Sequence, residues 1–158
     1  MTGPAEVRTI VVGLDGSAAS AAALRWAVEH AGAEHRTVTA VEVRSPVRLA
    51  PGTSYMMAPY GTTPPMERTR SRLHETVTAV REAMPNTPNT PEITELRLRG
   101  EPGIELARVA RDATMLVLGL NPHGKMTEFL FGHITAECLR HADVPVVLVP
   151  VSPSTSHS

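Results

Sequence analysis

The segment 117–135 combines an apolar strand, two glycines and a helix start in an order typical of phosphate-binding sites. An apolar run leads into Gly119, and Gly132 stands shortly before the expected last helix. In a parallel α/β sheet, ligands bind at the carboxyl ends of strands, against free amide groups at the start of the next helix. Gly119 lets the backbone approach a ligand closely, whereas Pro122 has no N–H to offer an anion. The segment therefore predicts an anion site with an altered donor set.

A second candidate group is Asp15, which separates an apolar strand from a helix start. Its carboxylate either accepts hydrogen bonds from a ligand or only favours a turn and a negatively charged helix entrance. Gly13 and Gly16 flank it, and glycines in this setting serve turns more often than ligand contacts. We take Asp15 and Gly13 as candidate binding residues and leave both interpretations open.

Other residue types give no pattern suited to catalysis or metal binding. The seven histidines lack the H-x3-H and H-E-x2-H spacings of zinc sites. Ser17 lacks the G-x-S-x-G setting of a catalytic nucleophile. The single cysteine, Cys138, excludes an internal disulfide, and its helical setting favours a buried structural role. We expect a solvated helix face to carry four arginines: Arg68, Arg70, Arg72 and Arg81.

Length and composition describe a single domain of ordinary globular type. The 158 residues are 42% hydrophobic and 20% charged, which suits a sizeable core. A net charge of -1 and an aromatic share of 3% give no support for a nucleic-acid or anionic-membrane surface. Residues 1–6 lack the basic start and apolar run of a signal peptide, and no apolar stretch reaches the roughly 18 residues of a membrane-spanning helix. We therefore expect a cytoplasmic protein.

Hydrophobic periodicity divides the chain into alternating strands and helices. Strands are expected at 8–14, 37–43, 93–98, 115–118 and 144–150, and helices at 17–34, 67–84, 104–111 and 135–141. Strands that alternate with helices form a parallel sheet covered on both faces. The order predicts a three-layer α/β sandwich with a five-stranded, mainly parallel sheet.

This domain is expected to span residues 7–150, between a short tail at 1–6 and a Ser-rich tail at 151–158 that we expect to be disordered. Within it, residues 45–66 are rich in proline and glycine and form a long loop. A loop of this length in a compact domain is functional or mobile. It leaves the carboxyl end of the second strand, so it either folds over a site there or is an insertion without a special role.

The chain resembles the universal stress protein family from Val7 to Val149. Three features carry the resemblance: the octet IVVGLDGS at 10–17, the triplet GEP at 100–102 before an apolar strand, and the glycine loop followed by VPVVLV at 144–149. The resemblance implies a Rossmann-like fold of the adenine nucleotide alpha hydrolase type. It also implies, as a possible ligand, an adenine nucleotide such as ATP, AMP or cAMP.

Nucleotide-binding members of that family carry the loop motif G-x2-G-x9-G-[S/T]. Gly119 and Gly132 match its first and third glycines with the spacing intact, whereas Pro122 and His133 replace the second glycine and the hydroxyl residue. The resemblance implies these roles: Asp15 hydrogen-bonds a ribose or adenine-side group, Val43 offers backbone contacts to adenine, and Gly119, Gly132, His133 and Ile134 face the phosphates. Thr135 completes with Ile134 the β-branched pair that usually follows the motif.

Because Pro122 and His133 depart from the motif, the sequence leaves open whether the loop binds a nucleotide. Proline at position 122 removes an amide donor, a loss of about 1 kcal/mol for a neutral hydrogen bond and more for a bond to phosphate. His133 pairs with phosphate when protonated and fills the anion's place when neutral. Lys125 and His123 supply positive charge nearby. Either nucleotide binding is weakened or shifted to a less phosphorylated ligand, or Pro122 and His133 close the pocket.

The leading hypothesis is a regulatory module that binds an adenine nucleotide weakly and is not an enzyme. One alternative is a nucleotide-free interaction or scaffold protein. A second is an enzyme of the ATP-pyrophosphatase type, which is disfavoured because residues 13–17 lack the Ser-Gly-Gly phosphate loop of such enzymes.

The final strand predicts a homodimer through Val144–Val149. An apolar strand at a sheet edge exposes unpaired amide and carbonyl groups, which another chain can cover. Family members are similar in pairing this strand with its copy across a two-fold axis. Pro145 and Pro150 are tolerated on an edge strand.

Overall fold

The computed structural model describes residues 8–44, 65–120 and 132–151. The expected loop at 45–66 and both expected tails lie largely outside these ranges.

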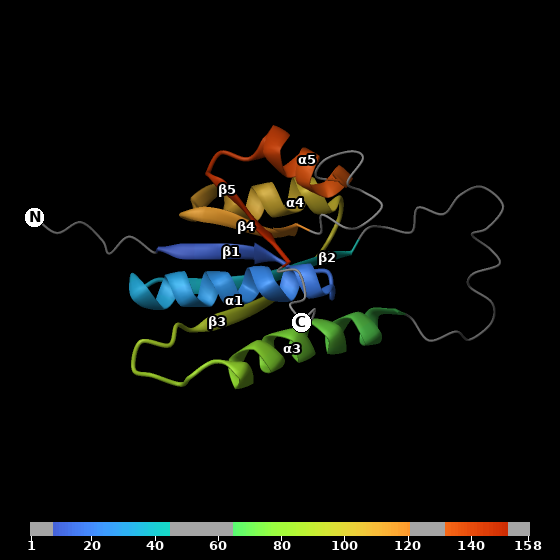
Figure 1. Ribbon diagram of the computed structural model, residues 1–158. Coiled ribbons are helices and arrows are strands. Elements are labelled where there is room, and N and C mark those ends of the chain that lie inside the picture. The colour runs from blue at the N-terminus through green and yellow to red at the C-terminus, as the bar shows by residue number, and fades with distance from the viewer. Residues whose placement is uncertain (1–7, 45–64, 121–131, 152–158) are drawn as a thin grey trace, which may run out of the picture.

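Five strands form one fully parallel sheet, as predicted (Figure 1). They are β1 (Thr9–Gly13), β2 (Thr37–Arg44), β3 (Ile93–Arg99), β4 (Met115–Leu120) and β5 (Val146–Pro150). Their order across the sheet is β3-β2-β1-β4-β5. The chain therefore moves outward from β1 in one direction, returns to β4, and moves outward in the other direction.

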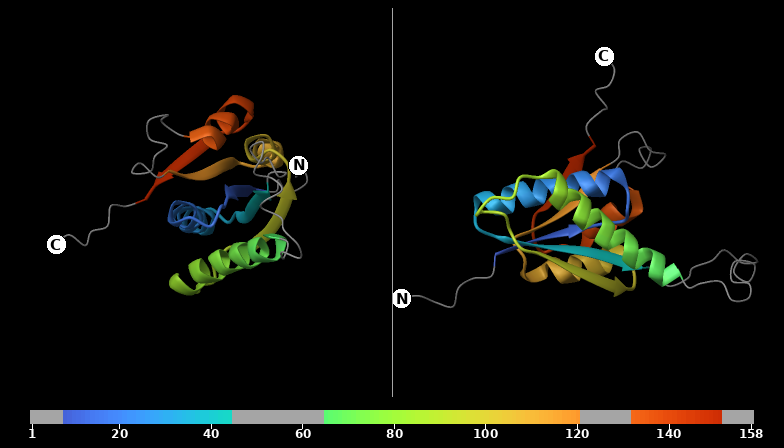
Figure 2. Two further views of the ribbon diagram at one scale, coloured as in Figure 1. Left: turned by 90° about the vertical axis from the view of Figure 1, so that its right-hand side faces the viewer. Right: turned by 90° about the horizontal axis from the view of Figure 1, so that it is seen from below.

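Four described α-helices cover the two faces of the sheet (Figure 2). They are α1 (Ala18–Ala33), α3 (Pro65–Ala83), α4 (Pro102–Val109) and α5 (Gly132–His141), and a 3-10 turn at Ala110–Asp112 follows α4. Helices α1 and α3 share one apolar core with the sheet, and α4 and α5 share the other. The three-layer α/β sandwich is confirmed.

The two cores follow from the alternation of side chains along each strand. Val12 points into the core under α1 and α3, whereas its neighbour Val11 points toward α4 and α5. Val38 and Val41 divide in the same way on β2. Because both faces are covered, the central strands are apolar at nearly every position, which is why 115–118 and 10–14 contain no charged residue.

Element boundaries differ from the expected ones by a few residues. Helix α4 begins at Pro102 instead of residue 104, because proline is favoured in the first helical turn, where an N–H would be unpaired anyway. Strand β5 begins at Val146 instead of residue 144, after Pro145. Gly119 belongs to β4, paired with Val149, and not to the loop in which the sequence placed it.

At Gly119 the backbone of helix α1 approaches the sheet closely. A Cβ atom at this position would lie 2.3 Å from both the carbonyl carbon and the carbonyl oxygen of Ala19. Real Cβ atoms do not approach a backbone so closely, so only glycine fits. Gly119, which is a predicted ligand contact, therefore has a packing role.

Cys138 is fully buried, as expected for a structural cysteine. Its Sγ lies 3.7 Å from the carbonyl oxygen of Gly103, at the contact between α4 and α5. Burial, assisted by the nearby negative charge of Glu137, raises the pKa of the Cys138 thiol to about 11. The thiol is therefore protonated at neutral pH.

We expect Gly119→Ala to destabilise the protein by at least about 2 kcal/mol, because overpacking against rigid groups costs on the order of 1–3 kcal/mol. Thermal unfolding of the purified variant measures the loss. Gly13→Ala is the matched control, since its Cβ would meet only the flexible ends of Leu118 and Leu106, at 2.9 and 3.0 Å. Equal losses in the two variants would contradict the close approach of α1.

Candidate functional site

The carboxyl edge of the sheet contains a topological switch point between β1 and β4. The chain leaves β1 toward α1 on one face, and leaves β4 toward α5 on the other. Adjacent strands whose connections diverge in this way leave a crevice in which α/β proteins bind ligands. Of the predicted site residues, Gly13 is the last residue of β1, Asp15 lies two residues after it, and Gly119 lies near the end of neighbouring β4.

A hydrogen-bonded turn fixes Asp15 between β1 and α1. Asp15 Oδ1 accepts the backbone N–H of Ser17 at 2.9 Å, while Ser20 Oγ accepts the N–H of Asp15 at 3.3 Å. Ser17 is the N-cap of α1, and its Oγ accepts the N–H of Ser20 at 3.1 Å. Gly16 has a φ of 85°, a backbone conformation that glycine adopts without strain. These bonds hold the Asp15 carboxylate at the end of β1.

The same turn sets the charge of Asp15. Partial burial raises the pKa of this carboxyl, but hydrogen bonds from Ser17 and Ser20 together lower it by more. The pKa therefore lies below the ordinary value of 3.8, and Asp15 is negatively charged at neutral pH. An ionised carboxylate at this edge is an acceptor for hydroxyl and amine groups.

Val43 lies near the end of β2, with its side chain half-buried against the core under α4 and α5. The carbonyl oxygen of Val41 accepts the N–H of Leu14 at 2.8 Å, so Val41 bonds on the β1 side. Successive residues of a strand direct their backbone N–H and C=O groups to opposite neighbouring strands, so Val43, two residues after Val41, also directs these groups toward the β1 side. At this level β1 has already ended. This position suits backbone contacts with a planar ligand above the β1–α1 turn.

The remaining candidates lie in the first turn of α5. Gly132 is the first residue of the helix, His133 and Ile134 are exposed, and Thr135 is buried. This turn packs against the start of α4, where a Cβ at Gly103 would lie 3.2 Å from the carbonyl oxygen of Ile134. Residues 121–131 join β4 to this helix, and Pro122, His123 and Lys125 lie outside the described residues.

A group of charged residues that sequence analysis did not select lies beside Asp15. Glu42 on β2 is next to Arg97 on β3 in the parallel register, and Arg72 of α3 packs over Gly16. Burial raises the pKa of Glu42 above its ordinary value of 4.5, although Arg72, Arg97 and Arg44 oppose the rise. A signal was present in the sequence, since charges at alternate positions of β2 and β3 interrupt otherwise apolar strands.

The expected solvated arginine face of α3 is confirmed for Arg72 and Arg81, the two of its members whose side chains are described. Arg72 is exposed, and its side-chain carbons also cover Gly16. A Cβ atom at Gly16 would lie 2.6 Å from Arg72 Cδ. Arg81 is exposed too, yet its Nη2 donates to the carbonyl oxygen of Ile93 at 3.2 Å. The side chains of Arg68 and Arg70 lie outside the described residues.

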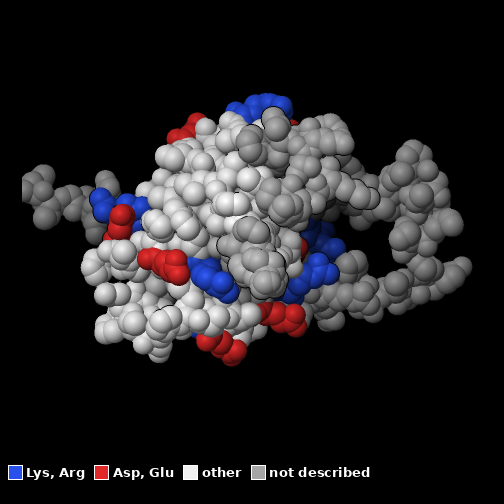
Figure 3. Space-filling model, in the orientation of Figure 1, with Lys and Arg blue, Asp and Glu red and all other residues white. Residues whose placement is uncertain are grey.

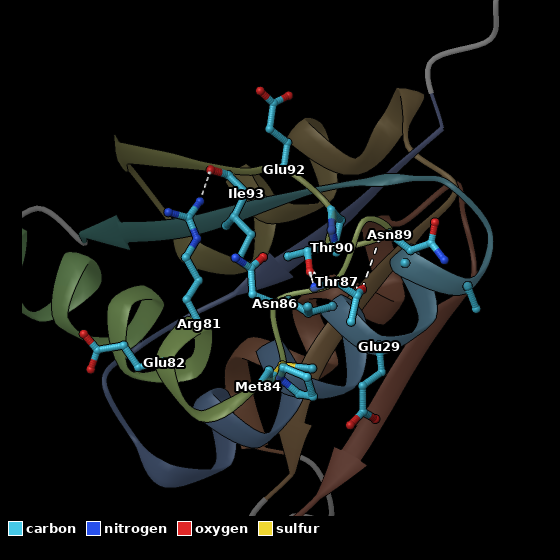
Figure 4. A pocket seen from close by; sticks show the side chains of 15 residues that line it. Glu29, Arg81, Glu82, Met84, Asn86, Thr87, Asn89, Thr90, Glu92 and Ile93 are labelled. Carbon is cyan, nitrogen blue, oxygen red and sulfur yellow. Dashed lines mark hydrogen bonds between the residues drawn. The ribbon is translucent and has the colours of Figure 1, made fainter.

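A cavity of about 740 Å³ lies at the opposite, amino edge of the sheet, away from the predicted site (Figure 4). It is lined by the ends of α1 and α3 and by residues 85–93, with Thr87 and Thr90 forming a hydrogen-bonded turn in its wall. Its lining includes Glu29, Glu82 and Glu92. Carboxylates and helix carboxyl ends both repel anions, so this cavity does not suit a phosphate.

The described ranges hold no group of three or more His, Cys, Asp or Glu side chains placed to share a metal ion. No helix within those ranges is long and apolar enough to cross a membrane.

A five-stranded parallel sheet with an acidic turn at its switch point defines an α/β domain of the Rossmann-like class. A model of the universal stress protein family matches residues 6–150, so the chain belongs to this family. Universal stress proteins of Mycobacterium tuberculosis and Mycolicibacterium smegmatis are each 28% identical to it, over 91% and 94% of the chain. These alignments cover 48% and 50% of the relatives, so the chain spans about half of their length.

Solved structures of the family share the fold. A universal stress protein from Archaeoglobus fulgidus in complex with dAMP has a TM-score of 0.62 at 22% identity, covering 90% of this chain and 97% of its own. A family member from Arabidopsis thaliana with AMP bound has a TM-score of 0.57 at 16% identity, covering 94% and 97%. A universal stress protein in complex with cAMP has a TM-score of 0.59 at 21% identity, covering 92% and 98%.

We expect Ser17→Ala to move the pKa of Asp15 upward toward 3.8, because the Ser17 side chain helps to lower it. Loss of the N-cap also costs about 1 kcal/mol of stability. A folded-state pKa below the unfolded value stabilises the fold above the unfolded pKa, and this contribution disappears as the pH falls through the folded pKa. Carbon-13 NMR titration of the Asp15 carboxyl measures the shift.

Ser17→Thr is the control for this variant, since it keeps a hydroxyl at the cap. An Asp15 pKa that is the same in Ser17→Ala and the wild type would show that the hydroxyl does not act on the carboxylate.

Proposed function

We propose that the chain is a regulatory module that binds an adenine nucleotide at the carboxyl edge of its sheet. The observation that carries the proposal is the Asp15 carboxylate, held at the switch point between β1 and β4 by the Ser17 amide. A fixed, ionised acceptor in such a crevice suits the hydroxyl groups of a ribose. Family members that bind cAMP, dAMP and AMP support the choice of an adenine nucleotide.

Each candidate residue has a place in this proposal. Asp15 accepts a ribose hydroxyl, Gly13 ends β1 two residues before it, and the backbone of Val43 faces adenine. The phosphates extend toward Gly119 and the first turn of α5, where the candidates are Gly132, His133, Ile134 and Thr135. A helix amino terminus attracts phosphate through its free amides and its dipole, and the exposed His133 adds positive charge when protonated.

Binding without turnover suits this set of residues better than catalysis does. The proposed ligand contacts are backbone groups, one carboxylate and one imidazole, and they hold a nucleotide without supplying a nucleophile. The proposed output is a change in how the chain contacts a partner when the nucleotide is bound.

We expect calorimetric titration of the purified protein to detect binding of ATP, AMP or cAMP. Asp15→Asn removes the charge from the proposed ribose acceptor and should weaken binding by about 10- to 100-fold, the value of a charge-assisted hydrogen bond. Asp112→Asn is the control, because Asp112 is exposed just before β4, at the opposite edge. Equal affinities of Asp15→Asn and the wild type would overturn the role of Asp15.

The double variant Pro122→Gly/His133→Ser restores the family's motif and tests the alternative of a closed pocket. A wild type that binds nothing and a double variant that binds nucleotide would favour the nucleotide-free interaction protein. If neither binds, the nucleotide-binding proposal itself fails.

We also propose a homodimer through the final strand. Strand β5 forms one edge of the sheet, and Val146 to Val149 are only half-buried. The carbonyl oxygen of Pro145 accepts from Leu116 on β4, so the alternate residues Val146 and Leu148 direct their backbone groups to the open side. A second copy of β5 in antiparallel orientation would pair with these groups.

We expect light scattering to give twice the chain mass of 16.9 kDa. Val146→Pro removes an outward N–H from the proposed ladder and should shift the protein toward the monomer, whereas Val28→Ala, inside the core under α1, should not. A wild type that is monomeric at micromolar concentration would contradict the dimer.

A further inference from the structure

A layer of charged side chains lies between α3 and the carboxyl halves of β2 and β3. Glu42 and Arg97 are register partners, so their side chains lie on the same face of the sheet, and Arg44 follows Glu42 on that face two residues later. Val38 and Ala40 precede them on this face and belong to the core under α1 and α3. The face is therefore apolar near the amino ends of the strands and charged near their carboxyl ends.

Helix α3 completes this layer with Arg72. Its Cδ and Cγ would lie 2.6 and 3.4 Å from a Cβ at Gly16, so the side chain extends over the turn that holds Asp15. Arg72 is exposed at the surface, and Figure 3 shows basic side chains gathered where β2 ends and α3 begins. A ligand in the crevice above Asp15 would therefore have an accessible guanidinium on its α3 side.

One guanidinium atom in this layer has no hydrogen-bond partner in the described structure. Three arginines, Arg44, Arg72 and Arg97, act on Glu42, and so does the carboxylate of Asp15. Arg97 Nε is buried and has no hydrogen-bond partner in the described structure. Glu95, another carboxylate of β3, is engaged by His74, with 3.0 Å between Nδ1 and a carboxylate oxygen. A buried guanidinium N–H without a partner favours an anion nearby.

The geometry points to a second phosphate subsite, formed by Arg72 and Arg97 with Arg44 beside them, that accepts a phosphate carried on the ribose of the nucleotide. This inference rests on the proposed nucleotide site. In the sheet, β1 separates β2 and β3 from β4, so the arginines lie on the opposite side of Asp15 from α5. A nucleotide whose 5′-phosphate points toward α5 would present its ribose to Asp15 and Arg72. The ligand class is an adenine nucleotide with a 2′- or 3′-phosphate in addition to its 5′-phosphate.

Calorimetry with four ligands tests the subsite: AMP, ADP, adenosine 2′,5′-bisphosphate and adenosine 3′,5′-bisphosphate. ADP controls for charge, because its added phosphate lies on the 5′ chain. We expect one of the bisphosphates to bind about tenfold more tightly than AMP, the gain of one charge-assisted contact. The preferred isomer identifies the hydroxyl that carries the phosphate.

Arg72→Ala should reduce the ratio of bisphosphate to AMP affinity to about one, and Arg72→Lys should keep part of the gain, because lysine keeps the charge but not the planar fork. Arg25→Ala, which removes an exposed arginine from α1, should leave the ratio unchanged. The gain should also fall as salt is raised from 50 to 500 mM, the range over which exposed charges become screened.

The outcomes separate this inference from the proposed function. If AMP binds but neither bisphosphate binds more tightly, or if Arg72→Ala leaves the ratio intact, the second subsite is wrong and the nucleotide site stands. If a bisphosphate binds in an Arg72-dependent way and AMP does not, the subsite stands and the 5′-phosphate assignment fails. If none of the four ligands binds, both are rejected.

Discussion

The contact between Gly119 and the first turn of α1 determines where the candidate site lies. Because residue 119 has no side chain, the backbone at Ala19 rests directly on the end of β4. That contact seats the amino end of α1 over the switch point and places its cap, Ser17, beside the end of β1. The cap in turn holds Asp15. The absence of a side chain at Gly119 thus affects the packing of α1 on the sheet, the position of its Ser17 cap and the position of the Asp15 carboxylate.

The face of the sheet under α3 combines two environments within the length of one strand. Near the amino ends, Val38 and Ile93 bury apolar surface against Val77 and Val80. Near the carboxyl ends, Glu42 and Arg97 replace this packing with charges that are only partly shielded from water. Apolar packing stabilises the domain by roughly 25 cal/mol per Å² of buried surface, whereas partly exposed charge pairs contribute little. The division is therefore costly for stability.

Much of the fold could be predicted from the sequence, because alternating apolar strands and amphipathic helices leave few other arrangements. All five strands and the four described helices were expected, and several of their ends shifted by two or three residues, as at Pro102, where proline favours a helix start, and at Val146, after Pro145. The packing role of Gly119 was not predicted, since it depends on a helix nearly a hundred positions earlier in the chain. The charged layer was missed for a similar reason, because only the β2–β3 register brings Glu42 next to Arg97.

The burial of Cys138 limits how this protein can react with oxidants. Oxidation requires a thiolate that peroxide can reach, and Cys138 is neither ionised near neutral pH nor accessible at the contact between α4 and α5. A disulfide with another chain would require the two helices to separate first. Any redox response through this side chain would thus report local unfolding rather than oxidant concentration.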